Sequence, residues 1–279
     1  MLLLAAAPLG NPLDASAHLK SAISAAVFIA AEDSRKLSRL CSDLQISHSA
    51  RVISFFEGNE LERIDELVAI MESGADLLVI TDAGMPGISD PGYRLVRAAL
   101  ERHIQVRVLP GPSAVTTALL LSGLPSDRFC FEGFPPRTRG ARQSWFENLL
   151  EEERTIIFFE APHRLLETLE DADQVLGSDR PAAICREMTK TYEEIIRGPL
   201  SHLLAWARSN EIRGEITMVV QGFDPESKQF TPQDFVELVK TEELSGITRK
   251  EAIDSVAKRL GVSKRSVFDA MVENKKSGQ

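Results

Sequence analysis

The sequence has few cysteines and no long apolar run. Cys41, Cys130 and Cys185 are far apart and lack metal-ligand spacing, which favours a reducing cytoplasm and argues against a structural disulfide or a metal site. No stretch approaches the eighteen or more apolar residues of a membrane span. The apolar start, residues 1–7, has no basic segment before it and predicts a buried strand rather than a secretion signal. We therefore expect a cytoplasmic protein without a metal or a membrane partner.

An overall surplus of positive charge is also lacking. The chain has 32 basic and 41 acidic residues, a net charge of −9 at pH 7. Taken alone, this weighs against nucleic acid, because phosphate contacts supply most of the affinity in such complexes. Residues 249–276 depart from the average, with eight basic residues against four acidic ones. A nucleic acid would therefore have to bind a local basic surface.

The common phosphate-binding and hydrolytic motifs are missing as well. The sequence has no G-x-G-x-x-G after its first expected strand and no G-x-x-x-x-G-K-[ST], so dinucleotide and P-loop nucleotide binding are unsupported. It has no G-x-S-x-G turn for a hydrolase and no His/Cys cluster for a metal. Glycine-rich loops are nevertheless present. They favour a cofactor that contains an adenosine but no phosphates.

The most distinctive of these loops is residues 81–92, T-D-A-G-M-P-G-I-S-D-P-G. It follows the apolar run 77–80, which is typical of a buried parallel strand, and precedes residues 93–100, whose apolar positions have helical spacing. An ordinary strand-to-helix connection is the alternative, but such connections usually need about two to six residues. Because ligands of open α/β sheets bind at the carboxyl ends of strands, we expect this loop to hold one.

Alternating strand and helix patterns predict an α/β fold with two α/β domains, residues 1–112 and 113–222. The first should contain a parallel sheet and the second a mixed one. A helix is expected over residues 14–25 with Asp14 as its N-cap, and another over residues 143–150. The expected strands are residues 2–7, 27–31, 51–56, 77–80, 104–109, 129–132, 155–160, 182–186, 193–197 and 215–220.

A linker is expected over residues 221–232, followed by a basic helical domain over residues 231–279. Two helices separated by Gly261 predict a helix-turn-helix-like arrangement. The alternative is a small helical cap that docks on its own chain or on a partner.

Several motifs, taken together and in order, resemble one known family. They are residues 7–12, 31–35, 82–92, 110–114, 123–129, 132–134, 160–165 and 186–190. The chain is identified by them as similar to the ribosomal RNA small subunit methyltransferase I family, within the tetrapyrrole methylase (class III methyltransferase) superfamily. The resemblance covers essentially the whole chain.

The resemblance implies two α/β domains with S-adenosyl-L-methionine between them, and a homodimer. It implies methyl transfer to the ribose 2′-hydroxyl of cytidine 1402 in the 16S rRNA of the small ribosomal subunit. By position in the motifs, the residues expected at the cofactor are Gly10, Asp82, Ala83, Gly84, Met85, Ile88, Ser89, Ser113, Ala114, Phe159, Glu160 and Glu215.

Such a reaction needs a base for the hydroxyl proton. Asp33, Glu57 and Glu187 lie at expected strand ends, and we hypothesise Asp33 as the base or orienter, with Arg35 and Lys190 placing the RNA. The alternative is that Asp33 caps its helix and pairs with Arg35.

Positive charge for the RNA is expected from Arg137, Arg139 and Arg142, beside Phe134. The alternative is a merely solvated basic face. Two other functions stay open, namely a class III methyltransferase for a tetrapyrrole or other small substrate, and a non-catalytic nucleic-acid-binding protein.

Overall fold

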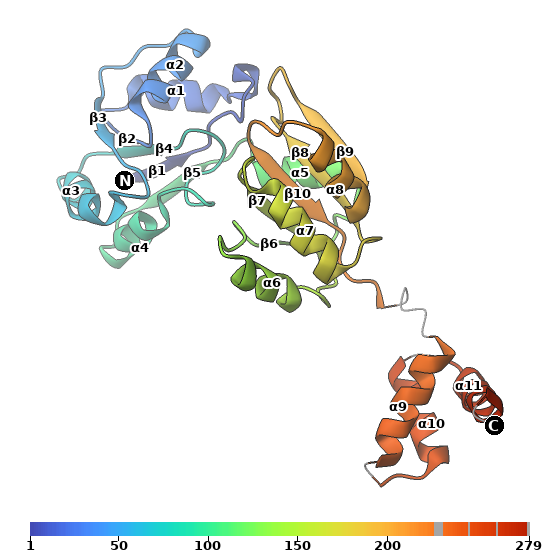
Figure 1. Ribbon diagram of the computed structural model, residues 1–279. Coiled ribbons are helices and arrows are strands. Elements are labelled where there is room, and N and C mark those ends of the chain that lie inside the picture. The colour runs from blue at the N-terminus through green and yellow to red at the C-terminus, as the bar shows by residue number, and fades with distance from the viewer. Residues whose placement is uncertain (226–230, 245, 261, 278–279) are drawn as a thin grey trace. The chain divides into compact units, whose positions relative to one another are not determined.

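The computed structural model describes residues 1–225, 231–244, 246–260 and 262–277. The chain divides into two compact units, Met1–Phe223 and Asp224–Gln279. The first unit contains two five-stranded sheets, and the second contains helices only (Figure 1). The expected α/β fold, with two sheets covered by helices and a helical C-terminal region, is confirmed. The proposed boundary between residues 112 and 113 falls between the last strand of the first sheet and the helix that follows it.

The first sheet is entirely parallel, in the order β3-β2-β4-β1-β5. Its central strand β4 is buried at every position because helices cover both faces of the sheet. The strands are β1 (Leu2–Ala5), β2 (Phe28–Ala31), β3 (Arg51–Ser54), β4 (Leu77–Ile80) and β5 (Val106–Leu109). The helices are η1 (Pro12–Asp14), α1 (Ala17–Ala25), α2 (Ser34–Leu44), α3 (Glu60–Glu72) and α4 (Tyr93–Glu101).

Alternate strand side chains of this sheet feed two apolar cores. Leu77 and Val79 pack with residues of α3 and α4, whereas Leu78 and Ile80 pack with residues of α1 and α2. The two pairs of helices lie on opposite sides of the sheet (Figure 1). The predicted start of α1 was wrong. Asp14 lies in η1, and the Ser16 hydroxyl accepts the Leu19 N–H bond that caps the helix.

The second sheet is mixed, as predicted, in the order β6-β7-β10-β8-β9. Only β6 and β7 are parallel, and the other pairs are antiparallel. Three helices cover one face, while α5 packs on the other (Figure 1). The strands are β6 (Phe129–Phe131), β7 (Thr155–Glu160), β8 (Pro181–Arg186), β9 (Glu194–Pro199) and β10 (Ile216–Val220). The helices are α5 (Ala114–Ser122), α6 (Arg139–Asn148), α7 (Leu165–Leu176) and α8 (Leu200–Ser209).

The helical unit contains α9 (Pro232–Leu244), α10 (Arg249–Leu260) and α11 (Lys264–Ser277) around one apolar core. The last two correspond to the expected pair, although Gly261, the predicted stop, lies outside the described residues. Helix α9 was not predicted. Its sequence signal is a reciprocal cap, in which Thr231 N donates to Asp234 Oδ2 at 2.7 Å and Asp234 N donates to Thr231 Oγ1 at 3.3 Å.

Within the described ranges, no helix is long and apolar enough to cross a membrane. The same part of the chain holds no group of three or more His, Cys, Asp or Glu side chains that could bind a metal. All three cysteines are buried and free.

Candidate functional site

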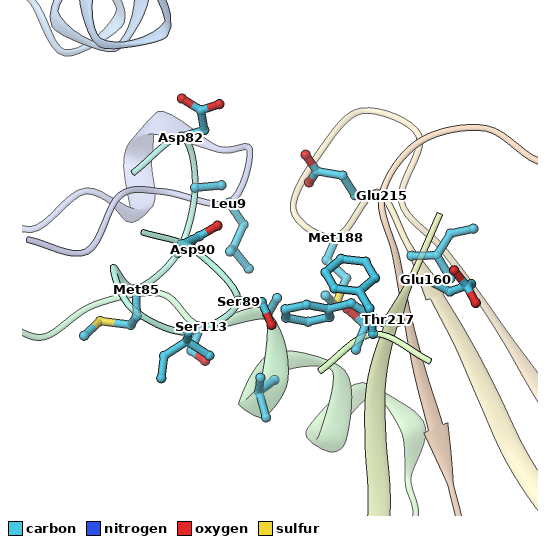
Figure 2. A pocket seen from close by; sticks show the side chains of 18 of the residues that line it. Leu9, Asp82, Met85, Ser89, Asp90, Ser113, Glu160, Met188, Glu215 and Thr217 are labelled. Carbon is cyan, nitrogen blue, oxygen red and sulfur yellow. The ribbon is translucent and has the colours of Figure 1, made fainter. Parts of the chain in front are cut away.

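A cavity of about 390 Å³ lies where loops from the first sheet face the ends of strands in the second (Figure 2). Its size is that of a pocket for a small organic ligand or cofactor. Loops that follow β2, β4 and β5 supply one wall, and the segments around Glu160, Met188 and Glu215 supply the other. The cavity is therefore built by both sheets of the first unit.

The loop after β4 is held by hydrogen bonds at both ends. Ala7 N donates to Gly84 O at 2.8 Å, and Gly84 N donates to Ala7 O at 3.0 Å. At the far end, Gly92 N donates to the buried carboxylate of Glu60 at 3.0 Å. Gly92 has φ of 136°, a conformation that side chains with a Cβ rarely adopt. The long loop is thus a fixed wall rather than a loose connection.

The opposite wall is largely apolar and aromatic. Phe159 lies edge-on to Phe131 and Phe134, with ring centroids 4.8 and 5.6 Å apart. Thr217 pairs with Phe159 across neighbouring strands, and Met188 belongs to the apolar cluster on which Phe159 packs. Figure 2 shows Met188 and Thr217 on this side of the cavity. Phe134 is 52% exposed, so the aromatic wall extends from the cavity to the surface. A flat organic ring could pack here.

Carboxylates dominate the polar lining. Glu32, Asp82, Asp90 and Glu215 line the cavity, whereas Lys36 is the one basic side chain that does so among the described residues. Lys36 Nζ lies 2.8 Å from Asp82 Oδ2, so that its charge is already paired. Such a cavity suits a cationic ligand and would repel phosphates.

Two of these carboxyl groups hold their protons more tightly than usual. Burial raises the pKa of Glu32, although the Asp82 N–H hydrogen bond at 3.1 Å opposes this rise. Burial, together with the nearby charge of Glu32, raises the pKa of Asp90 to about 7. Ionisable groups with shifted pKa values in a cavity are candidates for chemistry.

Comparison with known proteins identifies the family. A model of tetrapyrrole (corrin/porphyrin) methylases matches residues 1–204. A Mycobacterium tuberculosis protein named ribosomal RNA small subunit methyltransferase I is 46% identical, over 99% of this chain and 95% of that protein. The chain belongs to the ribosomal RNA small subunit methyltransferase I family. The resemblance inferred from the motifs is confirmed.

Solved structures support the fold of this methyltransferase family member. The methyltransferase CobJ has a TM-score of 0.62 at 17% identity, covering 79% of this chain and 93% of that chain. Uroporphyrin-III C-methyltransferase from Thermus thermophilus, complexed with S-adenyl homocysteine, has a TM-score of 0.54 at 15% identity, covering 79% and 96%. Identities this low establish a shared fold and nothing more.

Most residues that the family resemblance places at the cofactor line the cavity. They are Asp82, Ala83, Gly84, Met85, Ile88, Ser89, Ser113, Ala114, Phe159, Glu160 and Glu215. Among them, Glu160 is only 2% exposed, and its carboxylate accepts hydrogen bonds from Ala161 N at 2.8 Å and from the Thr168 hydroxyl at 2.5 Å. Glu160 therefore shapes the wall more than it offers a free charge.

Gly10 is the exception, because it does not line the cavity. The Lys190 side chain lies against it, so that a Cβ at Gly10 would overlap Lys190 Cγ. Lys190 Nζ lies 2.9 Å from both Glu187 Oε1 and Glu215 Oε2. Burial lowers the pKa of Lys190, but the hydrogen bonds to Glu187 and Glu215 outweigh burial and leave it raised. Lys190 thus links the two halves of the unit only by packing on Gly10, because both carboxylates that share its charge belong to the second half.

The structure assigns Asp33 and Arg35 a local role. Asp33 Oδ1 accepts the N–H of Arg35 at 2.8 Å and caps α2, while Arg35 Nη2 lies 2.7 Å from Asp33 Oδ2. These hydrogen bonds from Arg35 lower the pKa of Asp33 to about 2. Asp33 does not line the cavity described above, but a much smaller one that it shares with Lys36 and Asp82. A weakly basic carboxylate outside the cavity is a poor proton acceptor, so the capping alternative is favoured over the catalytic hypothesis.

The expected basic RNA-binding loop is only partly present. Helix α6 begins at Arg139 rather than at residue 143, which places Arg139 and Arg142 on a helix. Arg142 is 1% exposed and donates from Nε to Asp171 Oδ2 at 2.7 Å, so its prediction as a surface RNA contact was wrong. Arg137 is exposed, and Arg139, 69% exposed, pairs with Asp171 at 3.2 Å. The exposed pair remains available to a ligand.

Sequence reasoning missed several cavity residues, namely Leu9, Glu32, Lys36, Asp90, Val115 and Met188, and it expected Phe134 beside the RNA rather than at the cavity. Glu32, Asp90 and Met188 lie within the family motifs, so the signal was present. The motifs could not show which of their side chains point toward the cavity.

Proposed function

We propose that this chain is an S-adenosyl-L-methionine-dependent methyltransferase that acts on 16S rRNA of the small ribosomal subunit. The expected product is a 2′-O-methylated ribose at cytidine 1402. The observation that carries the proposal is the cavity itself, which joins an aromatic wall to an acidic rim and has no phosphate-binding loop. Its close relatives bear the name of ribosomal RNA small subunit methyltransferases.

The cavity residues fit this cofactor. Apolar side chains such as Leu9, Met85 and Phe159 can pack on an adenosine, and the carboxylates around them favour the positive charges of a sulfonium and an ammonium group. The bound cofactor supplies an electrophilic methyl carbon. The protein holds the acceptor oxygen in line with it, and well-oriented reactants can remove about 7–11 kcal/mol from a barrier.

An RNA contact is supported by the surface next to the aromatic wall. Arg164 Nη2 donates to Pro135 O at 2.7 Å and to Pro136 O at 3.0 Å, which fixes the turn between exposed Phe134 and exposed Arg137. An exposed aromatic ring followed by arginines suits unpaired RNA, which is bound by stacking and by phosphate contacts.

The helical unit is a weaker candidate for RNA binding than its composition indicates. Lys258 and Lys264 both pair with Asp254, and Arg259 lies 2.9 Å from Glu242 Oε1. Intramolecular pairing of this kind leaves less charge for phosphates. Its role as a helix-turn-helix-like RNA contact or as a cap remains part of the proposal.

A homodimer is also part of the proposal. Helix α5 covers one face of the second sheet alone, and Leu120 on this helix is 75% exposed. A second copy packed there would remove this apolar side chain from water. Cytoplasmic action follows from the proposed substrate.

Two measurements test the function. Calorimetry should detect binding of S-adenosylmethionine and of its demethylated product to the purified chain. Mapping of 2′-O-methylated ribose should then find one additional site in small-subunit rRNA after incubation with the protein and cofactor, using naked rRNA and assembled subunits as separate substrates. Methylation of tetrapyrrole precursors instead of rRNA would contradict the substrate, and absence of cofactor binding would contradict the whole proposal.

A further inference from the structure

Asp90 lies in the wall of the cavity near the end of the long loop after β4. Figure 2 shows it on the side that carries Leu9 and Asp82, across the cavity from Met188 and Glu215. We propose that Asp90 is the general base that accepts the proton of the ribose hydroxyl. This inference rests on the proposed function and identifies the residue that performs its proton transfer.

The backbone around Asp90 is fixed. Gly87 N donates to Pro91 O at 3.1 Å, closing a turn around residues 88–90. The backbones of Gly87 and Gly92 approach so closely that a Cβ on Gly92 would lie 3.3 Å from Gly87 N. Ser89 has φ of 59°, an unusual conformation for a residue with a side chain. A base held this rigidly loses little entropy when it meets its substrate.

The other carboxylates that line the cavity are already engaged. Asp82 pairs with Lys36 at 2.8 Å, and Glu215 pairs with Lys190 at 2.9 Å. Glu32 accepts the Asp82 N–H, and Glu160 accepts bonds from the Thr168 hydroxyl and from Ala161 N. Each of these contacts occupies oxygen lone pairs of its carboxylate, which leaves fewer of them free for a substrate hydroxyl. Glu32 shares a raised pKa with Asp90, but its carboxylate already accepts the Asp82 N–H.

The surroundings of Asp90 make its carboxylate more basic than usual. Burial and the charge of Glu32 raise its pKa to about 7, and the charges of Asp82 and Glu215 add smaller contributions to this rise. The hydroxyl of Thr81 lowers it through a hydrogen bond. Lys36, the cation of this cavity, is paired with Asp82 and only partly offsets the surrounding negative charge. A base whose pKa lies near neutral pH is ionised often enough to accept a proton and basic enough to hold it.

The proposed step balances. As the bond between the ribose oxygen and the methyl carbon forms, the bond between that carbon and sulfur breaks, and its electron pair stays on sulfur. The hydroxyl proton passes to an oxygen of Asp90 and then to water.

The test compares Asp90→Asn with the wild-type protein in single-turnover methyl transfer to small-subunit rRNA between pH 5.5 and 9. Loss of a general base typically lowers a rate by about 10²–10⁴-fold. We expect a loss in this range, an unchanged affinity for S-adenosylmethionine, and disappearance of the inflection near pH 7. The exposed Asp65, on α3, provides the matched control, and Asp65→Asn should retain the wild-type rate and profile.

A second variant tests whether neighbouring negative charge raises the pKa of Asp90. Glu32→Gln removes the charge that contributes most to the raised pKa of Asp90, so the inflection of the remaining activity should move to lower pH.

Three outcomes overturn the inference. They are a wild-type rate in Asp90→Asn, a residual rate that keeps its inflection near pH 7, and a rate loss matched by an equal loss of cofactor affinity. The last would make Asp90 a cofactor ligand. Failure of the proposed function looks different, because the wild-type protein itself would then neither bind S-adenosylmethionine nor methylate rRNA.

Discussion

Arg142 donates a hydrogen bond from Nε to Asp171 Oδ2 at 2.7 Å, and both side chains are about 1% exposed. The pair joins α6 to α7 beneath the exposed arginines. Gln143 Nε2 and Arg139 Nε also donate to Asp171, at 3.0 and 3.2 Å. One aspartate therefore organises the basic segment that the sequence presents as a run of free charges.

Arg142→Ala should lower the free energy of unfolding of the first unit. Removing one partner of a buried ion pair typically costs about 3–5 kcal/mol, because the other charge is left uncompensated. Arg139 and Gln143 still contact Asp171, so we expect the lower end of this range. Urea unfolding measures the loss. Arg137→Ala, at an exposed position, is the control and should change stability by less than about 0.5 kcal/mol. Equal stability of the two variants would contradict the structural role of Arg142.

Arg137→Ala combined with Arg139→Ala should weaken RNA binding and leave cofactor affinity unchanged. Each phosphate contact on single-stranded RNA contributes about 0.7 to the slope of log affinity against log salt. We expect the slope to fall by up to about 1.4 in filter binding over a salt series. Asp171 keeps its bond to Arg142, so the fold should survive. Loss of RNA and cofactor binding together would indicate that the segment is structural.

Much of the fold could be predicted from sequence because apolar periodicity records burial. The four apolar residues of β4 predict a strand covered on both faces, and the structure buries all four. The ends of helices were harder to predict where side-chain hydrogen bonds determine them. Asp14 and Ser16 are both good N-caps, and only the Ser16 hydroxyl accepts the Leu19 N–H. Helix α9 was missed because its Thr231–Asp234 cap lies in a polar, proline-containing segment.

The sequence could predict which loops form the candidate site. It could not predict what each side chain in those loops does. The parallel sheet brings the ends of β2, β4 and β5 to one edge, which is why motif residues converge. The state of each carboxylate depends on contacts across the fold. Asp33 pairs with Arg35, two residues away, whereas the charge that most raises the pKa of Asp90 is that of Glu32, in another loop. A pair only two residues apart, such as Asp33 and Arg35, can be predicted from the sequence. The proximity of Asp90 and Glu32 depends on the fold and cannot be.

Asp90 should make the stability of the protein depend on pH. Its pKa is raised from 3.8 to about 7 on folding, so the folded state binds its proton more tightly between these values. The contribution is fully present below pH 3.8 and is lost as the pH rises through 7. The full shift corresponds to about 4 kcal/mol, and contact with water reduces this to about 1–2 kcal/mol.

Asp90→Asn should therefore be more stable than the wild-type protein at pH 8, by about 1–2 kcal/mol relative to their difference at pH 4. Urea unfolding at both pH values measures this. A stability difference between the two proteins that does not change with pH would show that Asp90 has an ordinary pKa in the folded state.

Gly10→Ala should disturb the link between the two halves of the first unit. The backbone of Gly10 needs no unusual conformation, so the effect comes from the new Cβ, which would overlap Lys190 Cγ. Lys190 is held at its far end by Glu187 and Glu215, and moving its stem would break these ion pairs.

We expect a loss of about 1–3 kcal/mol for such overpacking and a weaker affinity for S-adenosylmethionine, because Glu215 lines the cavity. Gly140→Ala is the matched control. Gly140 lies in α6, and a Cβ there meets nothing within 4 Å, so alanine should stabilise the helix by about 0.5–1 kcal/mol. Thermal unfolding measures the change in stability of both variants, and calorimetry measures their affinity for S-adenosylmethionine. If Gly10→Ala binds the cofactor as tightly as the wild-type protein, Lys190 has no part in holding Glu215 at the cavity wall.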